Sequence, residues 1–256
     1  MKFEFLRKVN KKLRDFFKEN GFGCDVCGAE LFDYPVHRLC ADCEGKLQRN
    51  DGRVCPKCGR RTVAEGVCLN CKSNMPSFTQ GFSPFVYRGE SASFINRVKN
   101  GAPLLAAYFA EQMADDFLRK YPDAERFKRE PLLLVPVPMT EKKRKQRGYN
   151  QAEELAEGVC EKLKASGYSV ELDIGILQKV KDAAEQKHMD YKSRQDNVSG
   201  AFHVHKRKAC QGRTVVLVDD IMTTGATGNE CAKRLLGAGT KEVLFLTATA
   251  LPELKE

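Results

Sequence analysis

One segment near the C-terminus restricts the fold more than any other part of the chain. An apolar run, Val215–Val218, leads into the acids Asp219 and Asp220, and a group of small residues follows. These small residues are Thr223, Thr224, Gly225, Ala226 and Thr227. A continuous apolar run is typical of a parallel strand that is buried on both faces. The pattern therefore predicts a buried strand that ends at the two acids, with a tight loop beyond it.

The residues beyond this loop complete a strand–loop–helix–strand unit. A helix is expected over Asn229–Leu236, and Gly237 and Gly239 end it. Glu242–Ala248 has the composition of a second strand. Such a unit places its loop at the carboxyl edge of a parallel sheet, where open α/β sheets bind their ligands. The acids and the small residues are therefore candidates for a binding site.

The chemistry of this loop favours a phosphorylated sugar. Backbone N–H groups of small residues can approach an anion closely, and the N-terminus of the following helix adds a positive dipole. Asp219 and Asp220 would repel a phosphate, but they can accept hydrogen bonds from two sugar hydroxyls or hold a hydrated Mg²⁺. The chain has neither a P-loop motif nor a dinucleotide-binding fingerprint. A ribose 5-phosphate that carries further phosphate fits best, and an ordinary loop with incidental acids is the alternative.

The middle of the chain supplies the remaining elements of an α/β domain. Strands are expected at Phe82–Tyr87 and at Leu132–Val137, and Pro136 is expected to break the second one. Helices are expected at Ala92–Val98, Leu104–Leu118 and Asn150–Ala165. Helices that alternate with short strands predict a mainly parallel sheet flanked by helices.

Eight of the eleven cysteines form four Cys-x-x-Cys pairs within residues 24–71. The pairs are Cys24 and Cys27, Cys40 and Cys43, Cys55 and Cys58, and Cys68 and Cys71. Two cysteines at this spacing can direct both sulfurs at one Zn²⁺, and two pairs complete a closed tetrahedral site. A redox dithiol or an iron–sulfur centre is the alternative, but tandem pairs at this spacing are more typical of zinc ribbons.

The loops between the pairs decide how the pairs share two zinc ions. Pairing neighbours in sequence closes shorter loops than a cross-braced arrangement does, and it costs less entropy. We therefore expect the first two pairs to bind one ion and the last two pairs to bind the other. Four thiolates leave no open coordination position, so both ions are expected to be structural. A block with few large apolar side chains needs such metal ions to support its fold.

These patterns divide the chain into a basic amphipathic helix at residues 1–21, a double zinc ribbon at 22–77 and the α/β domain at 78–256. The helix is expected to pack on its own protein, and a membrane surface or nucleic acid is the alternative. The formal charge of +9 permits binding to phosphates or nucleic acid without demanding it. The longest apolar run, Leu104–Ala110, is too short to cross a bilayer, so a soluble, cytoplasmic protein is expected.

Several segments resemble a known family. Val215–Thr227 resembles the 5-phosphoribosyl-1-pyrophosphate (PRPP) binding motif of type I phosphoribosyltransferases. Val135–Pro138 with Arg147–Gln151 resembles a segment of the ComF family, and so does Gln186–Phe202. The cysteine block is similar to the double zinc ribbon that precedes the transferase-like domain in that family.

Tyr87 and Lys99 fall where members of the ComF family carry a Tyr and a Lys. Taken together, the matching segments cover residues 24–250. The resemblance implies a type I phosphoribosyltransferase-like fold. It also implies roles for single residues. Asp219 and Asp220 would contact the ribose hydroxyls and Mg²⁺, residues 223–227 the 5-phosphate, and Arg147 the pyrophosphate.

The basic residues beside Arg147 would balance charge on the pyrophosphate, and solvated lysines are the alternative. They are Lys142, Lys143, Arg144 and Lys145. Residues 183–199 have the mixed charge of a flexible lid. No catalytic residue is assigned. Similar transferases that act on 6-oxopurines carry an acid three residues after the second Asp, where this chain has Thr223.

The family resemblance implies a PRPP-binding protein that assists the handling of single-stranded DNA during natural transformation. Its partners would be PRPP or a related phosphoribosyl ligand, single-stranded DNA and proteins of the competence machinery. The alternative is an active phosphoribosyltransferase of nucleotide metabolism that uses PRPP and Mg²⁺, with the ribbons as a scaffold. A third interpretation treats the ribbons as a docking module and the second domain as a ligand sensor. The sequence contains no aromatic–basic repeat of the kind that binds single strands, so DNA binding rests on the resemblance.

Overall fold

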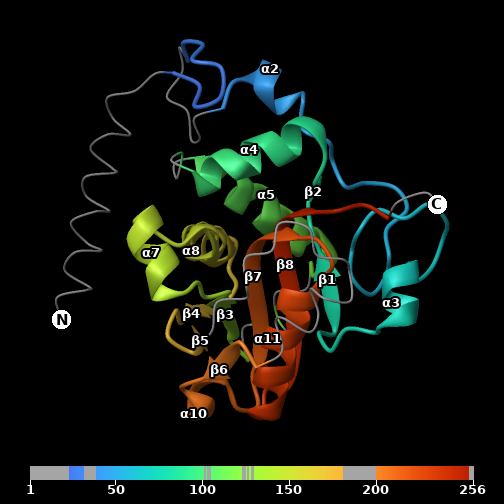
Figure 1. Cartoon of the computed structure of the whole chain (residues 1–256), viewed down its shortest axis with the longest axis vertical. Helices are drawn as coiled ribbons and strands as arrows, with labels where there is room; N and C mark the ends of the chain where they lie inside the picture. The colour runs from blue at the N-terminus through green and yellow to red at the C-terminus, as the bar shows by residue number, and fades with distance from the viewer. Residues whose placement is uncertain are drawn as a thin grey trace.

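The computed structural model describes residues 23–31, 39–100, 102, 105–122, 125, 127, 130–180 and 200–253 (Figure 1). The amphipathic helix expected in residues 1–21 and the lid expected in residues 183–199 lie outside the described residues. Within the described part, no helix is long and apolar enough to cross a membrane.

A parallel sheet forms the centre of the molecule. Its strands are β1 (Gln80–Phe82), β2 (Phe85–Val86), β3 (Leu132–Pro136), β4 (Val170–Leu172), β7 (Thr214–Met222) and β8 (Glu242–Ala250). Their order is β1-β8-β7-β3-β4, and β2 pairs with β8 beyond β1. Every pair in this sheet is parallel, which confirms the predicted α/β fold class. A separate antiparallel pair joins β5 (Leu177–Lys179) to β6 (Phe202–Val204).

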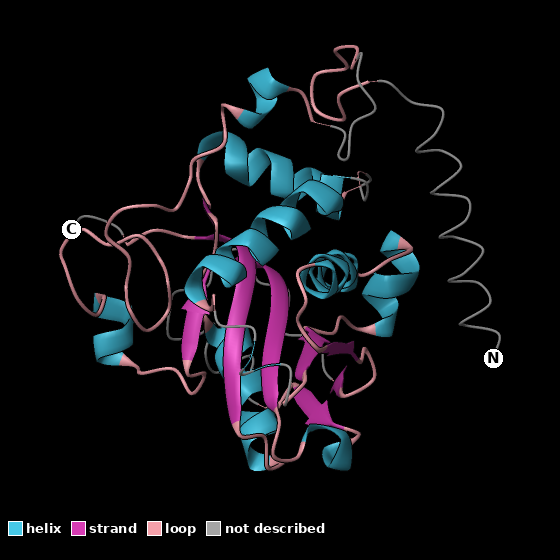
Figure 2. Cartoon of the chain, turned by 180° about the vertical axis from the view of Figure 1, so that it is seen from behind, coloured by secondary structure: helices cyan, strands magenta, loops and turns pink. Residues whose placement is uncertain are grey.

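Helices cover both faces of the sheet (Figures 1 and 2). The longer ones are α4 (Gly89–Lys99), α5 (Leu105–Lys120), α8 (Gln151–Ala165) and α11 (Ala226–Gly237). The shorter ones are α2 (Ala41–Glu44), α3 (Leu69–Ser73), α7 (Glu141–Arg147) and α10 (Arg207–Cys210). Helices α4, α5 and α8 share one apolar cluster with one face of the sheet, and α11 packs on the other face.

The central strand β7 shows why its sequence is apolar throughout. Val216 and Val218 belong to the cluster with α5 and α8, whereas Val215 and Leu217 belong to the cluster with α11. Successive side chains of a strand point to opposite faces, so a strand covered on both sides needs apolar residues at every position. Because β7 is parallel to both of its neighbours, β3 and β8, its end lies at the carboxyl edge of the sheet.

The expectation that β7 ends at the acids is wrong, because the strand continues through them to Met222. Its partner β8 runs on in register, with Asp219 opposite Thr247 and Met222 opposite Ala250. The apolar pattern marks only the part of the ladder that is buried on both faces. The hydrogen-bonded ladder itself extends further, so it holds both acids in extended backbone.

Two smaller expectations also need correction. Pro136 does not break β3. The next residue, Val137, donates to the Val218 carbonyl of β7. Pro136 itself faces the opposite side of the strand, where β4 has already ended at Leu172, so its missing N–H removes no hydrogen bond between strands. The single strand expected at Phe82–Tyr87 is instead the end of β1 followed by β2. The expected helices of the described region are present, with boundaries shifted by a few residues.

Candidate functional site

The two acids of β7 have different surroundings. Asp220 is buried, and its Oδ2 lies 3.1 Å from Nζ of Lys99, the last residue of α4. This buried oxygen accepts no hydrogen bond among the described residues. The side chain of Asp219 turns back on its own strand, where Oδ1 accepts a hydrogen bond of 2.9 Å from the backbone N–H of Asp220. The acid pair therefore has one oxygen held by a cation and one held by the backbone of its own strand.

Burial raises the pKa of Asp219 well above its ordinary value, and the charge of Asp220 raises it further. The N–H of Asp220 and the ammonium of Lys99 act in the opposite direction. A carboxylate in this position gains from a cation that approaches it. Carboxylate oxygens are the ligands that Mg²⁺ prefers, so the acid pair fits such an ion together with sugar hydroxyls.

The loop after β7 has the geometry of an anion site. Gly225 has a φ of +82° and directly precedes α11, so the chain turns sharply before the helix begins. The N–H groups of Thr223, Thr224 and Gly225 have no acceptor within the described part of the chain. Thr224 Oγ1 accepts from the N–H of Ala226 at 3.3 Å. Unpaired N–H groups beside a helix N-terminus form a site for a phosphate.

Close packing fixes the position of α11 behind this loop. A Cβ at Gly228 would lie 2.4 Å from the ring of Phe245 on β8, so only glycine allows this approach of helix and sheet. The N-terminus of α11 is therefore held against the strand that follows it. The loop between β7 and α11 has little freedom to move away from the acids.

Arg147 is the last residue of α7, and it is exposed. Gly148, with a φ of +80°, ends this helix, and Arg147 Nη1 donates to Gln151 Oε1 at 3.3 Å. Among the described contacts, none joins Arg147 to the acids or to the loop after them. Arg144 of the same helix makes two bonds, of 2.6 and 2.9 Å, to the carboxylate of Glu153. Arg144 is therefore engaged in the fold, and the role of Arg147 stays a prediction.

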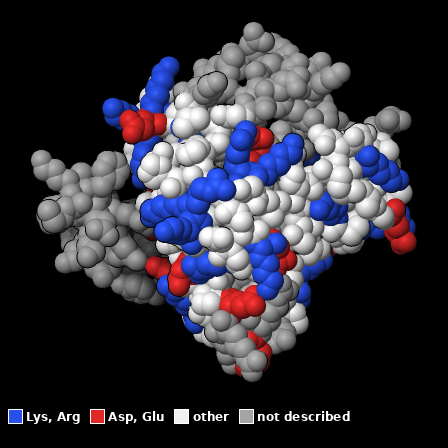
Figure 3. All heavy atoms as spheres, turned by 90° about the horizontal axis from the view of Figure 1, so that it is seen from below, with Lys and Arg blue, Asp and Glu red and all other residues white. Residues whose placement is uncertain are grey.

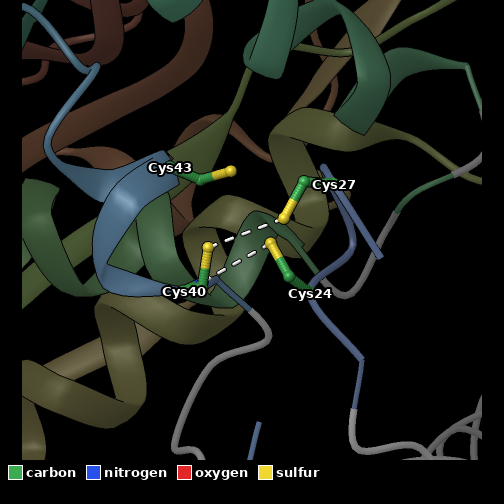
Figure 4. A group of neighbouring side chains, drawn as sticks. All are labelled: Cys24, Cys27, Cys40 and Cys43. Carbon is green, nitrogen blue, oxygen red and sulfur yellow. Dashed lines mark hydrogen bonds between the residues drawn. The ribbon is translucent and has the colours of Figure 1, made fainter. Parts of the chain in front are cut away.

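The first cysteine group joins the first two pairs, as predicted from loop length (Figure 4). The Sγ atoms of Cys27 and Cys40 are 3.6 Å apart, close to the ~3.8 Å between ligands of a tetrahedral zinc–sulfur site. The group packs beside α4 and α5: Arg97 donates to the carbonyls of Asp25 and Val26. Cys27 is exposed and Cys40 is half-buried, so solvent reaches one side of this group.

The second cysteine group joins the last two pairs, and all four of its cysteines are buried. The Sγ atoms of Cys58 and Cys68 are 3.7 Å apart, which again suits tetrahedral zinc. This group belongs to the same apolar cluster as β3, β7, β8 and α11. Glu253 fixes it from the C-terminal side, where its carboxylate accepts from the N–H groups of Val63 and Leu69.

In each cysteine group one thiol has a lowered pKa, whereas the pKa values of Cys43, Cys68 and Cys71 are raised. The pKa of Cys58 is lowered chiefly because the thiols of Cys68 and Cys71 donate hydrogen bonds to its sulfur. The charge of the Arg60 guanidinium acts in the same direction, and both effects outweigh the burial of Cys58, which raises the pKa. Burial raises the pKa of Cys24. Hydrogen bonds from the backbone of Cys27 and Cys40 outweigh this effect and lower the pKa to about 6. Thiolates are the form that binds zinc, so each group contains a cysteine prepared for a metal ion.

Sequence reasoning missed one residue near the loop. Arg60 follows the second group's Cys58 and reaches the carbonyl of Thr223, where its Nη2 donates a hydrogen bond of 2.8 Å. The available signal was a basic residue directly beside a thiolate pair, which by itself does not indicate a contact with another part of the chain. The three cysteines outside the block, Cys160, Cys210 and Cys231, are buried and free, as expected of inert thiols.

Comparison with known proteins supports this site. The phosphoribosyl transferase domain family matches residues 108–255, which include the acids and the loop. Competence protein ComFC of Bacillus subtilis is 27% identical over 229 residues, which cover 86% of this chain and 88% of that protein. Competence protein F of Haemophilus influenzae is 26% identical over 218 residues, which cover 80% of this chain and 93% of that protein.

DNA utilization protein YhgH of Salmonella typhi is 28% identical over 217 residues, covering 82% of this chain and 90% of that protein. These alignments span most of this chain and nearly the full length of each relative. The two cysteine groups fit the double zinc ribbon of the ComF resemblance, which these relatives confirm. The chain therefore belongs to the phosphoribosyl transferase domain family.

Proposed function

We propose that this protein binds PRPP with Mg²⁺ at the end of β7 and assists the handling of single-stranded DNA in the cytoplasm during natural transformation. The observation that carries the proposal is the pairing of two acids with a loop of unpaired N–H groups at one sheet edge. The acids suit the ribose hydroxyls and Mg²⁺, and the loop suits the 5-phosphate. Arg147 would contact the pyrophosphate.

The DNA part of the proposal draws on the names of the relatives and on charge. Two relatives are named competence proteins, and a third is named a DNA utilization protein. Figure 3 displays a face on which Lys and Arg side chains gather across the middle. A basic face attracts the phosphates of nucleic acid without sequence preference. Proteins of the competence machinery are the further partners that this function would require.

An active phosphoribosyltransferase of nucleotide metabolism is the second candidate. Membership of the transferase family favours it. The residue three positions after Asp220 argues against purine chemistry, because Thr223 has no carboxylate, and its carbonyl accepts from Arg60. A threonine hydroxyl cannot serve as the general base that such a reaction needs. We therefore favour PRPP binding in DNA handling over a purine transferase.

Calorimetry with PRPP, in the presence and absence of Mg²⁺, tests the ligand. We expect binding that needs Mg²⁺ and that is lost when Asp219 and Asp220 are both replaced by Asn. Asp173→Asn is the matched control, because Asp173 pairs with Lys206 away from the loop. Unchanged PRPP affinity in the double variant would show that the acids do not form the site.

A second pair of measurements separates the two candidate functions. Gel shifts with single-stranded oligonucleotides should show binding that weakens as the salt concentration rises. Pyrophosphate release from PRPP should stay at background over a panel of nucleobases. Release with one base, together with no oligonucleotide binding, would favour the transferase of nucleotide metabolism.

A further inference from the structure

One buried side chain connects the second cysteine group to the loop after β7. Arg60 is 3% exposed, although arginine is rarely buried without partners. Its Nε donates to Cys58 Sγ at 3.3 Å, and its Nη2 donates to the Thr223 carbonyl at 2.8 Å. The same guanidinium therefore contacts a zinc ligand and the first residue of the loop.

The cysteine group explains why a charged side chain can stay buried here. The guanidinium keeps its charge at all relevant pH values, and burying it is costly unless an anion lies close by. Four thiolates around Zn²⁺ carry a net charge of about −2, which supplies that anion. With its charge balanced, Arg60 can donate a charge-assisted hydrogen bond to Thr223, and such bonds are stronger than neutral ones.

The contact with Thr223 sets the direction of a loop N–H. A peptide unit is planar and trans, so its carbonyl and its N–H point in opposite directions. When Arg60 holds the Thr223 carbonyl, the N–H of Thr224 must point away from Arg60. That N–H has no acceptor within the described part of the chain. Arg60 thus orients a donor that is free to bind an anion.

The ribbon cannot move away from the loop without breaking other contacts. The N–H of Gly81 on β1 donates to the Lys57 carbonyl at 2.8 Å, and a Cβ at Gly59 would lie 2.3 Å from the Gly81 carbonyl oxygen. The N–H of Ser77 donates to Asn229 Oδ1 on α11 at 2.7 Å. The second cysteine group is therefore seated on the sheet and on the helix that follows the loop.

We propose that Arg60 is a positioning residue that holds the Thr223–Thr227 loop in its phosphate-binding form and makes binding there depend on the second cysteine group. This inference rests on the proposed binding of PRPP at the loop. Because coupling between two sites is reciprocal, a phosphate bound at the loop should also stabilise the metal in the second group. The ribbon then acts on the ligand site as well as on the fold.

The test compares Arg60→Met, Arg60→Lys and the control Arg61→Met. Arg61 lies in the same ribbon but bonds to Arg49 and Asp51, away from the loop. Calorimetry uses PRPP and ribose 5-phosphate as probes, and zinc content and thermal unfolding are measured beside it. Loss of a charge-assisted hydrogen bond should weaken both ligands roughly tenfold or more in Arg60→Met. Arg60→Lys should recover part of the affinity, because it keeps the charge but not both contacts.

The outcomes separate this inference from the proposed function. If the wild type binds neither ligand, the proposed function fails and this inference fails with it. If the wild type binds both ligands and a folded Arg60→Met protein with two zinc ions binds them equally well, only this inference is overturned. Equal weakening by Arg61→Met would also overturn it, because general damage to the ribbon would then explain the loss.

A measurement on the wild type alone covers the case in which Arg60→Met does not fold. Zinc release to a chelator is followed with a metal-sensitive dye, with and without saturating ribose 5-phosphate. We expect the sugar phosphate to slow release from the buried second group and to leave release from the exposed first group unchanged. Equal release rates with and without ribose 5-phosphate would overturn the coupling.

Discussion

Nζ of Lys99 lies 3.1 Å from Oδ2 of Asp220, and this ion pair links the end of α4 to the carboxyl end of β7. The lysine side chain is 23% exposed and the aspartate side chain 6%. Lys99 therefore supplies the positive charge that a buried carboxylate needs before any ligand binds. It also connects the ligand edge of the sheet to a helix that packs against the first cysteine group.

Removal of this cation should destabilise the protein. Lys99→Met leaves Asp220 buried without its ionic partner, and we expect the free energy of unfolding to fall by about 3 kcal/mol, measured in urea. The double variant Lys99→Met with Asp220→Asn should recover a large part of that loss. Lys206→Met is the control, since its pair with Asp173 is more exposed and should be worth about 1 kcal/mol or less. Equal losses at Lys99 and Lys206 would contradict the structural role of the buried pair.

The two zinc ions should leave the protein at different rates. Cys27 is exposed and Cys40 is half-buried, whereas Cys55, Cys58 and their partners are all buried. A chelator reaches an exposed site directly, but a buried site must first open locally. We expect two phases of about one zinc ion each, with the second roughly tenfold slower or more. Cys27→Ser should remove the fast phase and keep the slow one; loss of the slow phase instead would reverse the assignment.

The sequence predicted the grouping of the cysteines because that grouping depends on local chain geometry. A spacing of two residues and short connecting loops leave little choice of partners, and both groups formed as expected. The parallel sheet was also predictable, since burial on both faces imposes the apolar runs of β3 and β7. The end of β7 was not, because hydrogen bonding to β8 continues beyond the apolar run.

Contacts between distant segments could not be predicted in the same way. Arg60 and Thr223 are 163 positions apart, and their hydrogen bond depends on how the ribbon is seated on β1. That seating requires the close approach of Gly59 and Gly81, two glycines that look ordinary in the sequence. The family resemblance marked Lys99 as a position of interest, but only the fold identifies Asp220 as its partner.

Arg147 should distinguish PRPP from ribose 5-phosphate. Only PRPP carries the pyrophosphate that Arg147 is proposed to contact, so Arg147→Ala should weaken PRPP roughly tenfold or more and leave ribose 5-phosphate nearly unchanged. The variant should fold normally, because Arg147 is exposed and its described bond is to Gln151. Calorimetry with both ligands measures the difference. Equal affinities of variant and wild type for PRPP would place the pyrophosphate elsewhere, and contact with nucleic acid would become the better role for α7.

Gly225 should be required for the shape of the phosphate loop. Its φ of +82° is a conformation that costs other residues about 1–2 kcal/mol, so Gly225→Ala should strain the turn before α11. Space is not the obstacle, because a Cβ there would meet only the Met222 side chain at 4.0 Å. Relief of the strain would rotate the loop N–H groups, and we expect PRPP and ribose 5-phosphate to weaken together.

Gly237→Ala, at the other end of α11, is the matched control for this change. Gly237 is helical, and a Cβ there would meet nothing within 4 Å, so alanine should be neutral or stabilise the helix by up to about 1 kcal/mol. Urea unfolding and calorimetry on both variants then separate loop shape from helix stability. A Gly225→Ala protein that loses stability but keeps its affinity for both ligands would show that the loop N–H groups do not hold the phosphate. Loss of affinity in Gly225→Ala alone, with Gly237→Ala unchanged, is the result that the backbone geometry of the loop requires.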